Sequence, residues 1–155
     1  NIFFIFHTYI CYNNNANGLR GDNMNKYEHL IQEAFAAKEF AYVPYSKFRV
    51  GAALLAKNGQ IFKGCNIENA SFTPTNCAER TAFFKAISEG VTEFEAIVVC
   101  GDQDQYLAPC GVCRQVMAEF CDLKEFQVIL AKSPEDYKVL SLEELFPYSF
   151  TKENL

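Results

Sequence analysis

The feature that most constrains this chain is a pair of cysteine motifs in its middle part. The first reads Cys77-Ala78-Glu79, and the second reads Pro109-Cys110-Gly111-Val112-Cys113. Each motif opens a segment with helical character. Three thiolates at this spacing are able to hold a zinc ion with one coordination position left open, and a carboxylate two residues from a ligand lies beside that position. The pattern therefore favours a site that activates water over a site that only stabilises a fold.

Length, composition and charge narrow the class of protein. A chain of 155 residues, half of them hydrophobic, is long enough for one domain with a substantial core. The net charge of −5 argues against a nucleic-acid partner, because phosphate binding requires a basic surface. A small neutral or cationic substrate fits an acidic protein better. No segment has the length of a membrane span, so we expect no membrane partner.

The cysteine content indicates the compartment. Seven cysteines cannot all pair within one chain, and their spacing favours metal ligation in a reducing compartment, which we take to be the cytoplasm. Outside the two motifs, Cys65, Cys100 and Cys121 stand in apolar surroundings. We interpret these three as small buried hydrophobic residues.

The first residues differ in character from the rest. The segment NIFFIFHTYICY is apolar but lacks the basic region and the cleavage site of a secretory signal. We interpret residues 1–23 as a leader or a cloning-derived extension, with Met24 as the natural start, and residues 24–155 as a single domain. A short hydrophobic anchor is the alternative interpretation.

Hydrophobic periodicity predicts an α/β fold. Apolar spacing over residues 26–42 predicts a helix ended by Pro44, and Asn58-Gly59 predicts a hairpin turn. The remaining predicted elements are strands at 48–56, 61–65, 94–100, 126–131 and 137–140 and helices at 77–89 and 110–120.

The order of these elements predicts the sheet. The link from Ala131 to Tyr137 is too short for a crossover helix, so the last strand should lie antiparallel to its predecessor. Ser141 then caps a short helix, with Glu144 completing a capping box. We predict a three-layer α-β-α fold around a central mixed five-stranded sheet.

A zinc site of this kind must favour thiolates over thiols. Cys77 and Cys110 each stand at a predicted helix N-terminus, where unpaired N–H groups favour negative charge. Arg80 is placed to donate hydrogen bonds to the sulfurs, which draws away the negative charge that three thiolates bring to zinc.

The fourth ligand distinguishes a catalytic site from a structural one. His7 and His29 lie far upstream without a partner at ligand spacing. Cys65 is the alternative, because it would close a structural site with four cysteines. Glu79 is either a solvated carboxylate or, beside a metal-activated water, a group that carries protons to the substrate.

Four ordered segments together resemble a known family. They are Tyr45-Ser46-Lys47-Phe48-Arg49-Val50-Gly51-Ala52-Ala53, Cys65-Asn66-Ile67-Glu68-Asn69-Ala70-Ser71, Cys77-Ala78-Glu79-Arg80-Thr81-Ala82 and Pro109-Cys110-Gly111-Val112-Cys113-Arg114-Gln115. This set resembles the zinc-dependent cytidine deaminases of the small homotetrameric class. The resemblance runs from Met24 to Phe150 and leaves the first residues outside it.

The resemblance implies one zinc ion per subunit and a role for each residue around it. The implied ligands are Cys77, Cys110 and Cys113, with Glu79 as the catalytic acid and base. Arg80 would bind the thiolates, and Gln115 would orient neighbours of the site.

The resemblance also implies the substrate contacts. Phe48 would pack on the pyrimidine, Asn66 and Glu68 would bind the ribose hydroxyl groups, and the backbone at Ala78 would read the edge of the base. Phe150 would reach into the site of an adjacent subunit of a homotetramer. An amide and a carboxylate two residues apart suit a diol, although both are also ordinary turn residues. The carboxylate would repel a phosphate, which favours a nucleoside over a nucleotide.

The implied reaction is the hydrolytic deamination of cytidine and deoxycytidine to uridine or deoxyuridine and ammonia, a step of pyrimidine salvage. Two alternatives stay open. One is an aminohydrolase of the same architecture that acts on another cytosine-bearing substrate. The other is a zinc module that binds a partner without catalysis.

Overall fold

The structure, a computed structural model, describes residues 27–155. The predicted leader over residues 1–23, Met24 and His7 lie outside these residues. Along the described chain the elements are α1 (Glu28–Lys38), β1 (Val50–Ala56), β2 (Ile61–Cys65), α2 (Ala78–Ser88), β3 (Phe94–Gly101), α3 (Gly111–Phe120), β4 (Gln127–Ala131), β5 (Tyr137–Ser141), α4 (Leu142–Leu145) and a final 3-10 turn (Lys152–Asn154). None of the helices in this part of the chain combines the length and the apolar character needed to cross a bilayer.

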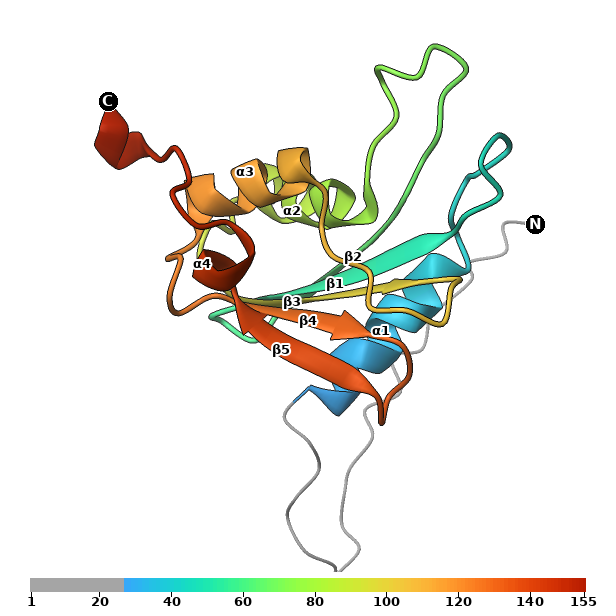
Figure 1. Cartoon of the computed structure of the whole chain (residues 1–155), viewed down its shortest axis with the longest axis horizontal. Helices are drawn as coiled ribbons and strands as arrows, with labels where there is room; N and C mark the ends of the chain where they lie inside the picture. Colours follow the sequence, from blue (N-terminus) through green and yellow to red (C-terminus); the bar gives the residue numbers. More distant parts are fainter. Residues whose placement is uncertain (1–26) are drawn as a thin grey trace, which may run out of the picture.

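The five strands form one mixed sheet in the order β2-β1-β3-β4-β5. β3 and β4 run parallel, and each other neighbouring pair runs antiparallel. Helix α1 covers one face of the sheet, and α2 and α3 cover the other, which gives three layers (Figure 1). The predicted α-β-α fold is therefore confirmed, including the antiparallel last strand.

The core lies on both faces of the central strands. β1 and β3 are buried almost throughout, as expected for strands covered on both sides. The larger cluster fills the space between the sheet and α2 and α3, where the Phe83 ring meets the ring of Phe94 edge-on at 5.0 Å between centroids. The smaller cluster packs Leu30, Ile31 and Ala34 of α1 against the opposite face.

The first helix is shorter than predicted. It ends at Lys38, so Pro44 does not terminate it. The chain turns directly afterwards, where the amide of Phe40 donates to Ala37 O. The side chain of Phe40 is exposed at this turn. Tyr42 then joins another segment, where its amide donates to Asn66 O at 3.0 Å.

A close approach between α2 and β2 sets the position of α2. A Cβ atom at Gly64 would lie 2.2 Å from the carbonyl oxygen of Ala78 and 2.6 Å from the amide nitrogen of Ala82. Only a glycine allows the first turn of this helix to rest on the strand backbone at that distance. The N-terminus of α2, with its cysteine and glutamate, is thereby held directly above the sheet.

The short helix α4 begins as predicted. Ser141 Oγ accepts a hydrogen bond from the Glu144 amide at 3.2 Å, and the Glu144 carboxylate accepts from the Ser141 amide at 2.7 Å. This is a complete capping box, and it satisfies two backbone donors at the helix start.

Candidate active site

Two helix N-termini meet at the cysteine motifs. Cys77 is the N-cap of α2 and Cys110 is the N-cap of α3, while Cys113 lies one turn further along α3. The free N–H groups of a helix start favour negative charge, and the Cys113 amide donates to the sulfur of Cys110 at 3.5 Å. Packing of both helices on the same face of the sheet therefore brings three sulfurs to one point.

The spacing of these sulfurs fits a single zinc ion. The Sγ atoms of Cys77 and Cys110 are 3.8 Å apart, those of Cys110 and Cys113 are 3.4 Å apart, and all three lie within 4.8 Å of one another. Sulfurs bound tetrahedrally to zinc at about 2.3 Å lie about 3.8 Å apart. Among residues 27–155 this cluster includes neither Cys65 nor His29. The cluster therefore offers three thiols as candidate ligands, a number that would leave zinc with one open position.

The surroundings of Cys77 favour its thiolate. Hydrogen bonds from Cys113 and from Arg80, whose guanidinium nitrogen lies 3.5 Å from the sulfur, lower the pKa of Cys77 to about 5 against the opposing effect of burial. The pKa of Cys113 rises, because its thiol is the partner of that thiolate and is itself buried. Arg80 also donates to Thr75 O at 3.3 Å, which fixes the guanidinium beside the cluster.

Glu79 has the environment of a proton carrier. Among residues 27–155, Glu79 is a charged residue buried in the core, with 4% of its surface exposed. Burial, with a smaller contribution from the charge on Cys77, raises the pKa of Glu79 to about 7. A carboxyl group with this pKa gains and loses a proton readily at neutral pH. Desolvation near a group of metal ligands is typical of a functional site.

A cavity of about 180 Å³ opens beside the cluster. Four segments of the chain line it, and they come from both sides of the cysteine motifs. The lining residues are Phe48, Val50, Asn66, Glu68, Thr75, Asn76, Cys77, Ala78, Glu79, Leu107, Ala108 and Cys110. The cavity therefore brings together two of the thiols, the buried glutamate and four side chains or backbone positions that the sequence predicted as substrate contacts.

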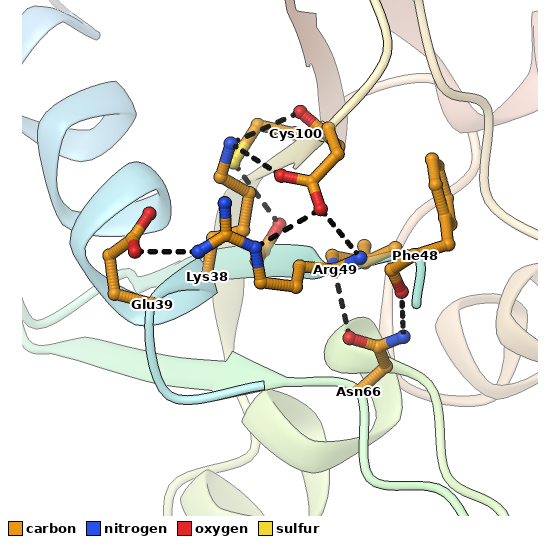
Figure 2. A network of polar contacts seen from close by, with 10 residues as sticks. Lys38, Glu39, Phe48, Arg49, Asn66 and Cys100 are labelled. Atoms are coloured by element: carbon orange, nitrogen blue, oxygen red, sulfur yellow. Dashed lines mark hydrogen bonds and ion pairs between the residues drawn. The ribbon is translucent and has the colours of Figure 1, made fainter. Parts of the chain in front are cut away.

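Asn66 and Glu68 also bind the backbone of the segment that carries Phe48. Asn66 accepts from the Val50 amide at 2.8 Å and donates to Phe48 O at 2.9 Å (Figure 2). The Glu68 carboxylate accepts from the Tyr45 amide at 2.9 Å, and hydrogen bonds from Ser46 and from the Tyr45 amide lower the pKa of Glu68. An amide and a carboxylate each have capacity for further hydrogen bonds, so both groups are able to bind a ligand as well.

The comparison with known families decides what kind of protein this is. Residues 24–130 match the family described as the cytidine and deoxycytidylate deaminase zinc-binding region. The chain belongs to this deaminase family. The finding agrees with the zinc-sized group of thiols and with the resemblance of the four sequence segments.

Curated relatives and solved structures agree with the deaminase family. A cytidine deaminase of Sporosarcina psychrophila is 53% identical over 128 residues, which are 83% of this chain and 93% of the relative. A cytidine deaminase of Halalkalibacterium halodurans is 52% identical over 126 residues, which are 81% and 95% of the two chains. The crystal structure of a cytidine deaminase from Burkholderia pseudomallei superposes with a TM-score of 0.74 at 48% identity and covers 79% of this chain and 97% of that chain.

Two of the predicted residues lie away from the cavity of their own chain. Phe150 follows α4 with 58% of its surface exposed. Gln115 of α3 donates from its side-chain amide to Phe150 O at 2.9 Å, so it contacts the C-terminal segment. Their predicted roles at a deaminase site, in an adjacent subunit for Phe150, stay predictions.

The structure adds cavity residues that the sequence analysis missed. Leu107 and Ala108 directly precede Pro109-Cys110, and Thr75 and Asn76 directly precede Cys77. Their positions next to Cys77 and Cys110 in the sequence could have identified them, because a residue adjacent to a helix N-cap lies close to that N-cap in space. The periodicity of a loop gives no information about which of its side chains face inward.

Proposed function

We propose that this protein catalyses the hydrolytic deamination of cytidine and deoxycytidine to uridine or deoxyuridine and ammonia. The observation that carries the proposal is the buried carboxyl of Glu79 in a cavity shared with the zinc-fitting thiols. A structural zinc module has no use for such a group beside an open coordination position. The activities of the relatives support the same reaction for this chain.

The chemistry requires a nucleophile and a group that moves protons. Cys77, Cys110 and Cys113 would hold the zinc ion, which would supply a Lewis acid that makes water nucleophilic at neutral pH. Glu79, protonated at the start, gives its proton to N3 of the cytosine ring, which makes C4 electrophilic. Glu79 then takes one proton from the attacking water and passes it to the amino group, which leaves as ammonia. The remaining hydroxyl proton on C4 returns to Glu79, so that the carbonyl of uridine forms and the carboxyl group is ready for another turnover.

Arg80 has a separate role in this proposal. Three thiolates bring more negative charge than a divalent cation carries, and this excess weakens the electrophile. The Arg80 guanidinium, 3.5 Å from the sulfur of Cys77, withdraws part of that charge. It also donates to the carbonyl oxygen of Thr75 at 3.3 Å, which holds the guanidinium beside the cluster.

Other residues that line the cavity would select the substrate. The aromatic ring of Phe48 supplies an apolar face for the pyrimidine, and the Ala78 backbone reads the base edge. Asn66 and Glu68 line the cavity with an amide and a carboxylate, which suit the hydroxyl groups of a ribose. Negative charge on Glu68 disfavours a phosphate in the same space, so we propose a nucleoside and neither a nucleotide nor a nucleic acid.

We extend the proposal to the assembly and the setting of the enzyme. Exposed aromatic side chains at Tyr148 and Phe150 support a homotetramer in which Phe150 enters the site of an adjacent subunit. All six cysteines in the described part of the chain are free thiols, which supports a reducing compartment, the cytoplasm, and a role in pyrimidine salvage.

The decisive experiment follows the loss of cytidine absorbance with the purified protein, with and without a zinc chelator. We expect turnover that the chelator abolishes and added zinc restores. Absence of turnover by the zinc-loaded protein would contradict the proposal.

A second assay separates substrates by ammonia release from cytidine, deoxycytidine, CMP and a cytosine-containing oligonucleotide. We expect release from the two nucleosides. Release from CMP or the oligonucleotide alone would instead identify an aminohydrolase with a different substrate, and zinc binding without any release would identify a binding module.

A further inference from the structure

The segment that carries Phe48 is held by side chains along both of its edges. On one edge Asn66 accepts from the Val50 amide and donates to Phe48 O, at 2.8 and 2.9 Å. On the other edge the Arg49 amide donates to the Asp102 carboxylate at 2.9 Å. Backbone groups of successive residues in an extended chain point to opposite sides, so these bonds continue the pattern of a strand (Figure 2).

Asp102 occupies the next position in the register of the sheet. Val50 of β1 pairs with Gly101 of β3, so the following antiparallel pair is Arg49 with Asp102. The carboxylate of Asp102 takes the place of a backbone acceptor at this position. Strand β1 is thereby extended toward the cavity by one residue pair that lies beyond the end of β3.

Charged partners hold Asp102 in place. Its carboxylate lies 3.1 Å from Arg49 Nε and 3.3 Å from Lys38 Nζ. Lys38 also donates to Gly101 O at 3.3 Å, and its side chain is only 12% exposed. Hydrogen bonds between charged groups that are shielded from water are stronger than exposed ion pairs. Lys38 supplies the shielded part of this network, whereas Arg49, with 39% of its side chain exposed, is a surface partner of Asp102.

Close packing of α1 on β1 lets Lys38 reach this point. A Cβ atom at Gly51 would lie 2.1 Å from Ala34 O and 2.7 Å from the Lys38 amide nitrogen. The end of α1 thus rests on the first residues of β1, and the lysine extends over them to the end of β3.

The same strand end touches the cavity wall. A Cβ atom at Gly101 would lie 3.1 Å from the Phe48 ring and 3.1 Å from the side chain of Leu107, and both of these residues line the cavity. A shift of the Gly101–Asp102 backbone therefore moves two residues of the wall together.

We propose that Asp102, held by Lys38 and Arg49, is a positioning residue for substrate binding: it keeps the Phe48–Val50 segment in its strand-like conformation, so that Phe48 and Asn66 face the cavity together. The proposal rests on the proposed function, because it assigns the wall to the nucleoside. Asp102 itself does not line the cavity, and its effect passes through the backbone of Arg49 and the contact of Gly101 with Phe48.

The test replaces Asp102 and measures kcat and KM separately. We expect Asp102→Ala to raise the KM for cytidine about tenfold, which is the size of effect that one lost hydrogen bond to a charged group produces. The kcat and the zinc content should stay near the wild-type values, because the thiols and Glu79 are untouched. Asp102→Asn keeps an acceptor for the Arg49 amide and should give an intermediate KM.

A matched control removes a different ion pair, which joins α1, the helix that carries Lys38, to β2. Glu33 of α1 pairs with Lys63 of β2 at 2.7 Å, and its side chain is 27% exposed, against 25% for Asp102. Glu33→Gln should therefore lose similar stability without a change in KM. Amide hydrogen exchange at Arg49 and Val50 should accelerate in Asp102→Ala and stay unchanged in Glu33→Gln.

The outcomes separate this proposal from the proposed function. If the zinc-loaded wild-type protein binds uridine in a calorimeter and turns over cytidine, the function stands whatever Asp102 does. A folded, zinc-loaded Asp102→Ala protein with wild-type KM and unchanged amide exchange would overturn the positioning role. An equal rise in KM for Glu33→Gln would also overturn it, since general destabilisation would then explain the effect.

Discussion

The thiol cluster and the cavity wall proposed to bind substrate are built by different means. The three thiols come from the N-terminal turns of α2 and α3, so helix geometry and packing on the sheet fix them. Phe48, Asn66 and Glu68 come from loops, and hydrogen bonds between side chains and backbone fix them. The proposed chemistry thus depends on regular elements, whereas the proposed binding depends on hydrogen bonds that can be replaced one at a time. Changes in the first region should abolish the reaction, and changes in the second should tune it.

The strongest way to break the cluster is to remove a ligand. We expect Cys110→Ala to lose zinc and all activity and to unfold at lower temperature, because metal binding stabilises the folded state. Zinc content by elemental analysis and the melting temperature measure these effects. Cys121→Ala, which removes a thiol at the other end of α3, should keep both zinc and activity. Full zinc occupancy in Cys110→Ala would remove Cys110 from the ligand set.

Glu79→Gln separates the metal from the proton carrier. The amide is nearly the same size as the carboxyl and leaves the thiols in place, so zinc content should not change. We expect kcat to fall by at least about 10²- to 10⁴-fold, the usual contribution of a positioned acid and base. Glu119→Gln, an exposed change on α3, serves as the control for the loss of one negative charge. Wild-type turnover in Glu79→Gln would exclude the proposed proton transfer.

Arg80→Ala tests the charge around the cluster. Loss of the guanidinium leaves the sulfur of Cys77 without its cationic partner, and we expect kcat to fall about 10- to 100-fold, as for other groups that contact metal ligands. Arg80→Lys restores a positive charge without the fork of donors and should recover part of the rate. Equal rates for the alanine variant and the wild type would show that charge compensation does not limit the reaction.

Glu68→Ala sharpens the comparison on the side of the wall. The carboxylate binds the amides of Tyr45 and Ser46 and lines the cavity, so its loss affects both the loop and the ribose. We expect the KM for cytidine to rise about tenfold, as for one hydrogen bond to a charged group, with a smaller change in kcat. Glu68→Gln keeps the shape of the side chain and one acceptor oxygen, so its KM for cytidine should rise less than that of Glu68→Ala. A loss confined to kcat would place Glu68 with the chemistry instead.

The smallest effect comes from a site that belongs to neither region. Ser141→Ala breaks the capping box of α4 and should lower the free energy of unfolding by about 1 kcal/mol. Denaturant titration measures the loss, and steady-state kinetics should show unchanged kcat and KM. A change in KM here would mean that substrate binding responds to any loss of stability, which would undo the contrast between the two regions.

The same contrast explains what the sequence was able to predict. The positions of Cys77, Glu79 and Cys110 at helix starts were predictable because short motifs encode them, and the capping box at Ser141 was predictable for the same reason. Their roles in metal binding and catalysis stay predictions. The end of α1 at Lys38 was missed, because contacts with Asn66 and beyond decide where that segment leaves the helix. The bond between Arg49 and Asp102 joins residues far apart in the chain, and no local periodicity encodes it.

The close contact at Gly64 limits which residues this position of β2 can accept. The helix that bears Cys77 and Glu79 rests on β2 where a side chain would collide with its backbone. A methyl group there would act as a wedge and tilt the helix, carrying one sulfur and the carboxyl away from the two sulfurs of α3. Gly64, a position without any side chain on a strand that contributes none of the proposed catalytic groups, therefore sets how the two halves of the proposed reaction centre are aligned.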